Sequence, residues 1–88
     1  MKPIDLEIKD AYFIPGRGVV AVVDVPRWLR LKAGEPAYAG KNCWIRTTIR
    51  GVEKSLWPVT ERCGLVFGSD VQPEDIEPGG FVRVFYTD

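Results

Sequence analysis

Few side chains in this sequence are of the types that perform catalysis. Histidine is absent, so acid–base or nucleophilic chemistry would rest on carboxylates, lysines or the two cysteines, Cys43 and Cys63. Glu53 and Glu61 are close in sequence, but carboxylates on two turns of a small β domain are ordinary surface groups. Cys63 starts an apolar segment, where a core thiol is expected and a reactive thiolate would need a cationic neighbour. We therefore expect a protein that is not an enzyme and that uses no cofactor.

A structural metal is not expected either. Two thiols cannot complete the usual four-ligand zinc site without carboxylates or a second chain. The sequence shows no secretion signal, and disulfides are rare in reducing compartments. We expect Cys43 and Cys63 to be reduced and buried or half-buried.

Side chains suited to binding occur in the segment 43–50, which alternates in the period-2 pattern of a strand. A tryptophan can stack on a base or a peptide, and arginines hold phosphates or carboxylates. The alternative is that Trp44 packs beneath the connection 27–32. One or two of the three tryptophans should lie in the core, because a buried tryptophan removes a large apolar area from water. The pattern places Cys43, Ile45, Thr47 and Ile49 inside, and Trp44, Arg46, Thr48 and Arg50 outside.

The elements that would position these side chains are short and β-rich. The segment 12–25 reads as a hairpin that reverses at Gly16 and Gly18, and 4–8 alternates as a strand before it. Gly51 is expected to make a turn, and Pro58 suits an edge strand over 52–59. One helical turn is expected over 72–76. Further strands are expected over 37–39, 43–50, 63–67 and 81–86, with a turn at Pro78-Gly79-Gly80.

Length and charge limit the classes of protein. A chain of 88 residues forms one domain, here 1–88, and no apolar run approaches the roughly 20 residues of a membrane helix. We expect a cytoplasmic protein that does not enter a membrane. The 12 basic and 12 acidic residues cancel, but 26–54 holds seven basic and two acidic residues, and 55–88 two basic and six acidic. This split indicates either a nucleic-acid face or two halves of one domain that attract each other.

Five short motifs occur in an order that resembles the second domain of elongation factor Tu. They are Gly16-Arg17-Gly18, Lys32-Ala33-Gly34-Glu35, Gly51-Val52-Glu53, Gly64-Leu65-Val66-Phe67 and Glu74-Asp75-Ile76-Glu77-Pro78-Gly79. The match runs from about Leu6 to Val84. It implies an all-β fold, a small closed and mostly antiparallel β-barrel of the translation-protein type.

The resemblance also implies where such a barrel would hold the aminoacylated end of tRNA. The family uses an aromatic residue before the Gly-Arg-Gly turn and the glutamate of Gly-Val-Glu, which match Tyr12 and Glu53. The family's arginine and asparagine fall near Leu56 and Cys63 and are not retained. No phosphate-binding loop of the Gly-x-x-x-x-Gly-Lys-Ser/Thr type occurs, so nucleotide hydrolysis is not expected.

Two functions from different classes follow from these patterns. The first is a non-catalytic binding module that docks on a protein or peptide, through an exposed strand or through Trp44, Arg46 and Arg50. The second is RNA binding that resembles the translation factors. Arg17 is either a solvated turn residue or a donor at the barrel mouth. A barrel with only a structural role is a third possibility.

Overall fold

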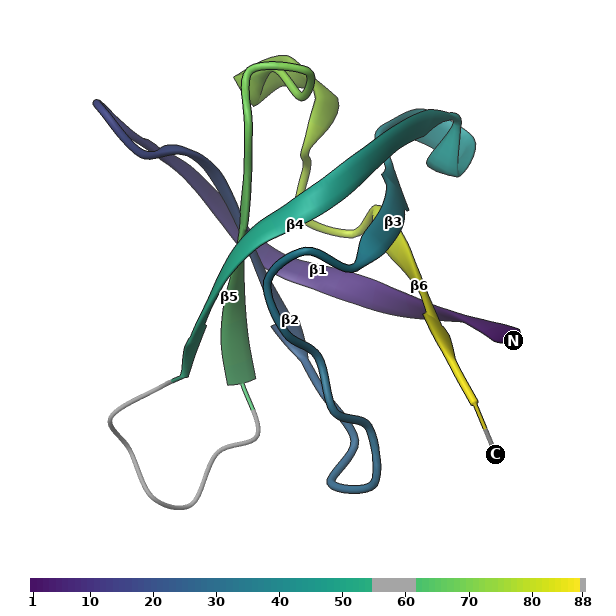
Figure 1. Cartoon of the computed structure of the whole chain (residues 1–88). Helices are drawn as coiled ribbons and strands as arrows, with labels where there is room; N and C mark the ends of the chain where they lie inside the picture. Colours follow the sequence, from purple (N-terminus) through teal and green to yellow (C-terminus); the bar gives the residue numbers. More distant parts are fainter. Residues whose placement is uncertain (55–61, 88) are drawn as a thin grey trace.

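Six antiparallel strands close into a barrel in the computed structural model, which describes residues 1–54 and 62–87 (Figure 1). Around the barrel the strands follow the order β1-β2-β5-β4-β3-β6. The all-β, closed and antiparallel barrel expected from the sequence is confirmed. The elements are β1 (Lys2–Ile14), β2 (Gly18–Asp24), β3 (Pro36–Ala39), η1 (Lys41–Cys43), β4 (Ile45–Lys54), β5 (Arg62–Phe67), η2 (Pro73–Asp75) and β6 (Phe81–Tyr86).

The first strand is longer than its alternating pattern predicted. β1 pairs with β6 along its first half and with β2 from Ile8 to the glycine turn, with an irregularity in the β1–β2 register between Ile8 and Asp10. Gly16 and Gly18 both have positive φ angles, 85° and 118°, which only glycine adopts at little cost. One strand therefore joins two neighbours, and this long strand crosses the whole molecule (Figure 1).

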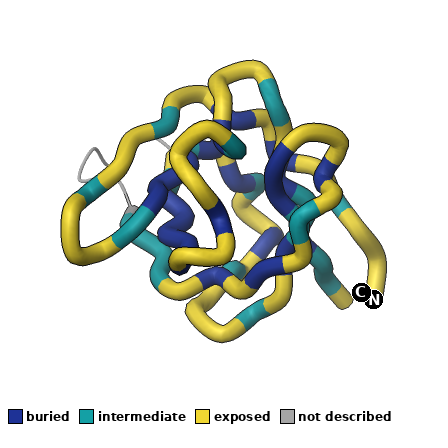
Figure 2. Tube along the Cα trace, turned by 90° about the horizontal axis from the view of Figure 1, so that it is seen from above, coloured by how far each residue is buried: buried dark blue, intermediate teal, exposed yellow. Residues whose placement is uncertain are grey.

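Side chains that point inward from all six strands form the core. Phe67, Ile8, Ile49 and Leu65 are among its largest fully buried members, and Leu29 and Val71 join it from the connections. Buried and exposed stretches follow one another along the trace (Figure 2). The period of two holds in the first half of β1 and in β4, whereas β2 and β5 are buried at successive positions. Burial of this apolar area is the main driving force for closing the barrel.

Gly51 does not make a turn, and this expectation was wrong. β4 continues through it to Lys54, with a register irregularity between Ile49 and Gly51 where Arg50 is the extra residue. A Cβ atom on Gly51 would lie 3.7 Å from the Val66 side chain, an ordinary contact between neighbouring strands. The first residues of the expected edge strand 52–59 belong to β4, and 55–61 lie outside the described residues.

Three connections lie at one end of the barrel: the hairpin turn 15–17, the segment 40–44 that holds η1, and the segment 68–80 that holds η2 (Figure 1). The helical turn expected over 72–76 is confirmed as η2. Thr47, buried on β4, donates a hydrogen bond to Asp70 at 2.6 Å and fastens the third connection. Within the described residues, no helix has the length and apolar character needed to cross a membrane.

Candidate functional site

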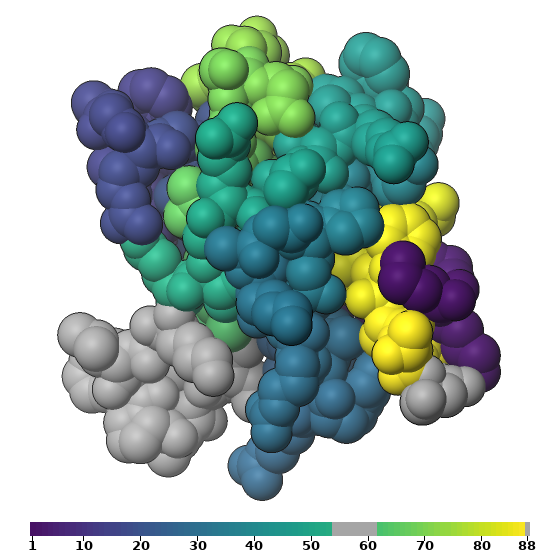
Figure 3. Space-filling model, viewed as in Figure 1, coloured from purple at the N-terminus to yellow at the C-terminus, as the bar shows by residue number. Residues whose placement is uncertain are grey.

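The outer face of β4 carries the first group of candidate residues. Trp44, just before the strand, is 71% exposed, and Arg46, Thr48 and Arg50 are exposed at alternate positions after it. The alternative that Trp44 packs beneath the connection 27–32 was therefore wrong. Side chains from residues 41–50, in teal, cover much of the upper right of the face in Figure 3. We call Trp44, Arg46, Thr48 and Arg50 the β4 line.

Two glycines leave room for the ends of this line. A Cβ atom on Gly40 would lie 3.4 Å from the Trp44 Nε1 atom, so the indole rests beside a residue without a side chain. A Cβ atom on Gly68 would lie 2.4 Å from Arg50 Nε, too close for any other residue unless the arginine moved. A side chain at position 68 would therefore displace Arg50, and Trp44 and Arg50 both remain exposed.

The two arginines of the β4 line have no ion pair with another described residue. Arg46 lies opposite Tyr38 on β3, and Arg50 borders a shallow hollow of about 400 Å³ together with Gly34 and Thr48. An unpaired guanidinium offers five N–H donors to a carboxylate or phosphate. The β4 line therefore combines a large apolar surface with two donor groups for an anionic partner.

A partner cannot extend the sheet along β4. Residues 36–39 of β3 pair with one edge of β4 and β5 pairs with the other. Where β3 has not yet begun, Gly34 N–H donates to Ile49 O at 2.7 Å, and Ile49 N–H donates to Glu35 O at 2.9 Å. The described backbone groups along this strand are largely used, so a partner on this face meets side chains.

The remaining candidates, Arg17, Glu53 and Tyr12, are spread over the neighbouring strands of the outer surface. Arg17, in the hairpin turn, forms an ion pair with Glu53 on β4, and the pair spans β5 because β5 lies between β2 and β4. Tyr12, half exposed, pairs with Val20, which pairs with Val66. Arg17 is thus partnered rather than merely solvated. Tyr12 is separated from β4 by two strands.

Asp5 and Arg83 join β1 to β6 on the outside of the barrel. The guanidinium donates to both carboxylate oxygens, at 2.7 and 3.1 Å. The hydrogen bond from Arg83 lowers the pKa of Asp5 and raises the pKa of Arg83. Both side chains are more than a third exposed, and such surface pairs contribute about 0 to 1 kcal/mol.

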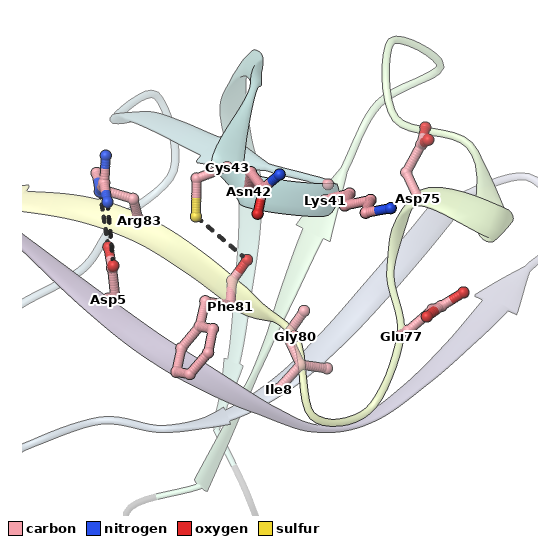
Figure 4. Close-up of a pocket in the computed structure, with 11 residues that line it drawn as sticks. Asp5, Ile8, Lys41, Asn42, Cys43, Asp75, Glu77, Gly80, Phe81 and Arg83 are labelled. Atoms are coloured by element: carbon pink, nitrogen blue, oxygen red, sulfur yellow. Dashed lines mark hydrogen bonds and ion pairs between the residues drawn. The ribbon is translucent and has the colours of Figure 1, made fainter.

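A pocket of about 640 Å³ that the sequence did not reveal lies between η1, the segment 75–80 and strands β1 and β6 (Figure 4). Asn42 and Cys43 in its wall have φ angles of 59° and 54°, the left-handed region that costs a residue such as cysteine about 1 kcal/mol. The Cys43 thiol points to the Phe81 carbonyl oxygen at 3.6 Å. The only sequence feature that could have indicated this pocket is Gly40 followed by the polar pair Lys41-Asn42.

Neither cysteine is bridged, as expected: Cys43 is buried and Cys63 half-buried. Burial, followed by the charge of Asp5, raises the pKa of the Cys43 thiol. A thiol with a raised pKa is a poor nucleophile at neutral pH. Among the residues that the structure describes, no three of the metal-ligating types come together.

Of the three tryptophans, the two described ones are both exposed. Trp28 is 59% exposed and packs edge to face on Tyr86, with 4.9 Å between ring centres. Neither Trp28 nor Trp44 belongs to the core, and Trp57 lies outside the described residues.

Comparison with known proteins gave no match, whether with protein-family models, with curated proteins or with solved structures.

Proposed function

We propose that this chain is a non-catalytic binding module that docks on an acidic segment of a protein through the β4 line. The observation that carries the proposal is the exposed Trp44 indole, aligned with Arg46 and Arg50, neither of which has an ion pair among the described residues. Exposed tryptophan and arginine are the residue types that dominate binding energy at protein interfaces.

The spacing along β4 favours an extended partner. Arg46 and Arg50 are four residues apart, about 13 Å on a strand that rises about 3.3 Å per residue. The hollow beside Thr48 and Arg50 lies at the end of this interval and has room for an apolar side chain. A segment with carboxylates at both ends of the interval and apolar residues beside Trp44 and the hollow matches this surface.

Reversal of one charge in the β4 line tests the proposal. The probe is a fluorescein-labelled peptide in which glutamates alternate with leucines, and fluorescence anisotropy gives its affinity. Arg46→Glu is expected to weaken binding by about tenfold or more, because a like charge would face the peptide. Arg30→Glu, an exposed cation in the connection between β2 and β3 with the same change in net charge, is the matched control.

The control decides what the probe reports. An unchanged affinity for Arg30→Glu would show that the loss in Arg46→Glu depends on the location of Arg46 on β4. Equal losses in the two variants would show a general attraction to positive charge and would contradict docking on this face.

RNA binding is the second candidate, and a separate observation favours it. Tyr12 and Glu53, the positions that match tRNA-contacting residues in the resemblance to elongation factor Tu, lie with Arg17 on the outer surface of β1, β2, β5 and β4. A Cβ atom on Gly64 would lie 3.9 Å from the Glu53 Cβ atom, so the position of β5 beside Glu53 carries no side chain. These features support a barrel of the translation-protein type, which we propose as the finer description of the fold.

A further inference from the structure

We propose that the pocket between η1 and the segment 75–80 is a binding site for an alkylguanidinium group, the head group of an arginine side chain. The proposal concerns a part of the surface distinct from the β4 line. Its volume of about 640 Å³ falls within the range of about 300 to 1,000 Å³ typical of ligand sites.

The charges around the pocket favour a cation. Asp5 and Arg83 are joined by two hydrogen bonds, so their opposite charges offset each other. Of the other charged residues in the lining, Asp75 and Glu77 are acidic and Lys41 is basic, which leaves an excess of negative charge. Asp75 uses one carboxylate oxygen to accept the Gln72 N–H at 2.8 Å, and the other oxygen is not used in that turn.

The hydrogen-bonding groups favour a guanidinium over a simple ammonium. The lining offers several acceptors: the two carboxylates, the Asn42 amide oxygen and the Phe81 carbonyl, which accepts a weak thiol hydrogen bond. A guanidinium supplies five N–H donors in one plane. Figure 4 shows the Asn42 amide pointing from η1 into the space above Gly80 and Ile8, with Glu77 at its right side.

An aliphatic stem fits the floor of the pocket. Ile8, Gly40 and Gly80 line the pocket and place no polar side chain in it. Asn42 lies in the wall with a left-handed backbone, a conformation that asparagine adopts more readily than most residues. A floor without polar side chains and acceptors at one end match a long side chain that ends in a cation.

The test is a titration of the ¹⁵N-labelled chain with acetyl-arginine methylamide, followed by amide chemical shifts. We expect saturable shifts confined to Lys41, Asn42, Cys43, Glu77 and Gly80. Acetyl-norleucine methylamide has a stem without the cation and is expected to cause none. Butylguanidine is the second probe: equal affinity would mean that any alkylguanidinium binds, whereas weaker binding would indicate an arginine within a polypeptide.

Two substitutions with opposite expected effects separate recognition from damage to the fold. Glu77→Gln should weaken binding of the capped arginine by about tenfold, because a charge-assisted hydrogen bond is lost. Lys41→Gln should tighten it, because a competing cation is removed. Glu74→Gln, an exposed acid in η2 outside the pocket, is the matched control and should change nothing. Unsaturable shifts, binding of the norleucine compound, weaker binding by Lys41→Gln, or equal effects at Glu74 and Glu77 would each overturn the proposal.

Discussion

The Gly18→Ala variant is expected to lose about 3 to 5 kcal/mol of unfolding free energy, a large part of the stability of a small domain. Gly18 has a φ angle of 118°, where a residue with a side chain is strained. A Cβ atom there would also lie 2.3 Å from the carbonyl oxygen of Phe67. That oxygen belongs to β5 backbone beside one of the most deeply buried side chains, so it has no room to retreat.

Urea denaturation followed by far-ultraviolet circular dichroism measures this loss, and Gly16→Ala is the matched control. Gly16 is in the same turn with a φ angle of 85°, but a Cβ atom there would meet nothing within 4 Å. Its substitution should cost only the backbone strain, about 1 to 2 kcal/mol. Equal losses for the two variants would contradict the close approach of β2 and β5 at Gly18.

The Trp44→Ala variant is expected to keep its fold and lose its partner. At 71% exposure, the indole contributes little to the core, so the unfolding free energy should change by less than about 0.5 kcal/mol. If Trp44 anchors the docking face, affinity for the acidic peptide should fall by about 30-fold, the effect typical of an interface hot spot.

Trp28→Ala provides a control of the same chemistry. Trp28 is also more than half exposed, but it lies in the connection between β2 and β3 and contacts Tyr86. Its removal should leave peptide affinity unchanged and reduce stability by about 1 kcal/mol through the lost ring pair. Unfolding of Trp44→Ala would place that residue in the core, and unchanged binding would remove it from the docking face.

Local patterns in the sequence predicted the strands well. The alternation of Ile4, Leu6 and Ile8, and of residues 45–50, predicted the strands and the faces that the structure shows. The expected strand 43–50 began two residues too early, because Cys43 belongs to η1 and Trp44 lies just before β4. Each of these segments keeps one face against the core, and burial enforces the period of two. The glycine hairpin was predicted for the same reason, since positive φ angles at Gly16 and Gly18 are what such a turn requires.

Properties set by distant neighbours were not predictable. Gly51 has the sequence signature of a turn, but here it pairs with Val66 of β5 inside a strand, and only the folded barrel brings the two together. The pocket was not predicted for the same reason. Asn42 and Glu77 are far apart in sequence and line one pocket only after β3, β6 and β1 have assembled. Alternation predicted that Trp44 faces outward, but it could not predict whether another segment of the chain would cover the side chain.

The most direct test of docking through β4 is an amide chemical-shift titration of the ¹⁵N-labelled chain with the glutamate–leucine peptide and, separately, with bulk tRNA, at about 50 and about 200 mM salt. With the peptide, we expect saturable shifts from Trp44 to Arg50 that largely persist at the higher salt, because the indole contact is apolar. Binding driven by several phosphates would instead weaken by orders of magnitude over that interval. Shifts with tRNA alone, centred on Tyr12 and Glu53 and lost at the higher salt, would contradict peptide docking and favour RNA binding.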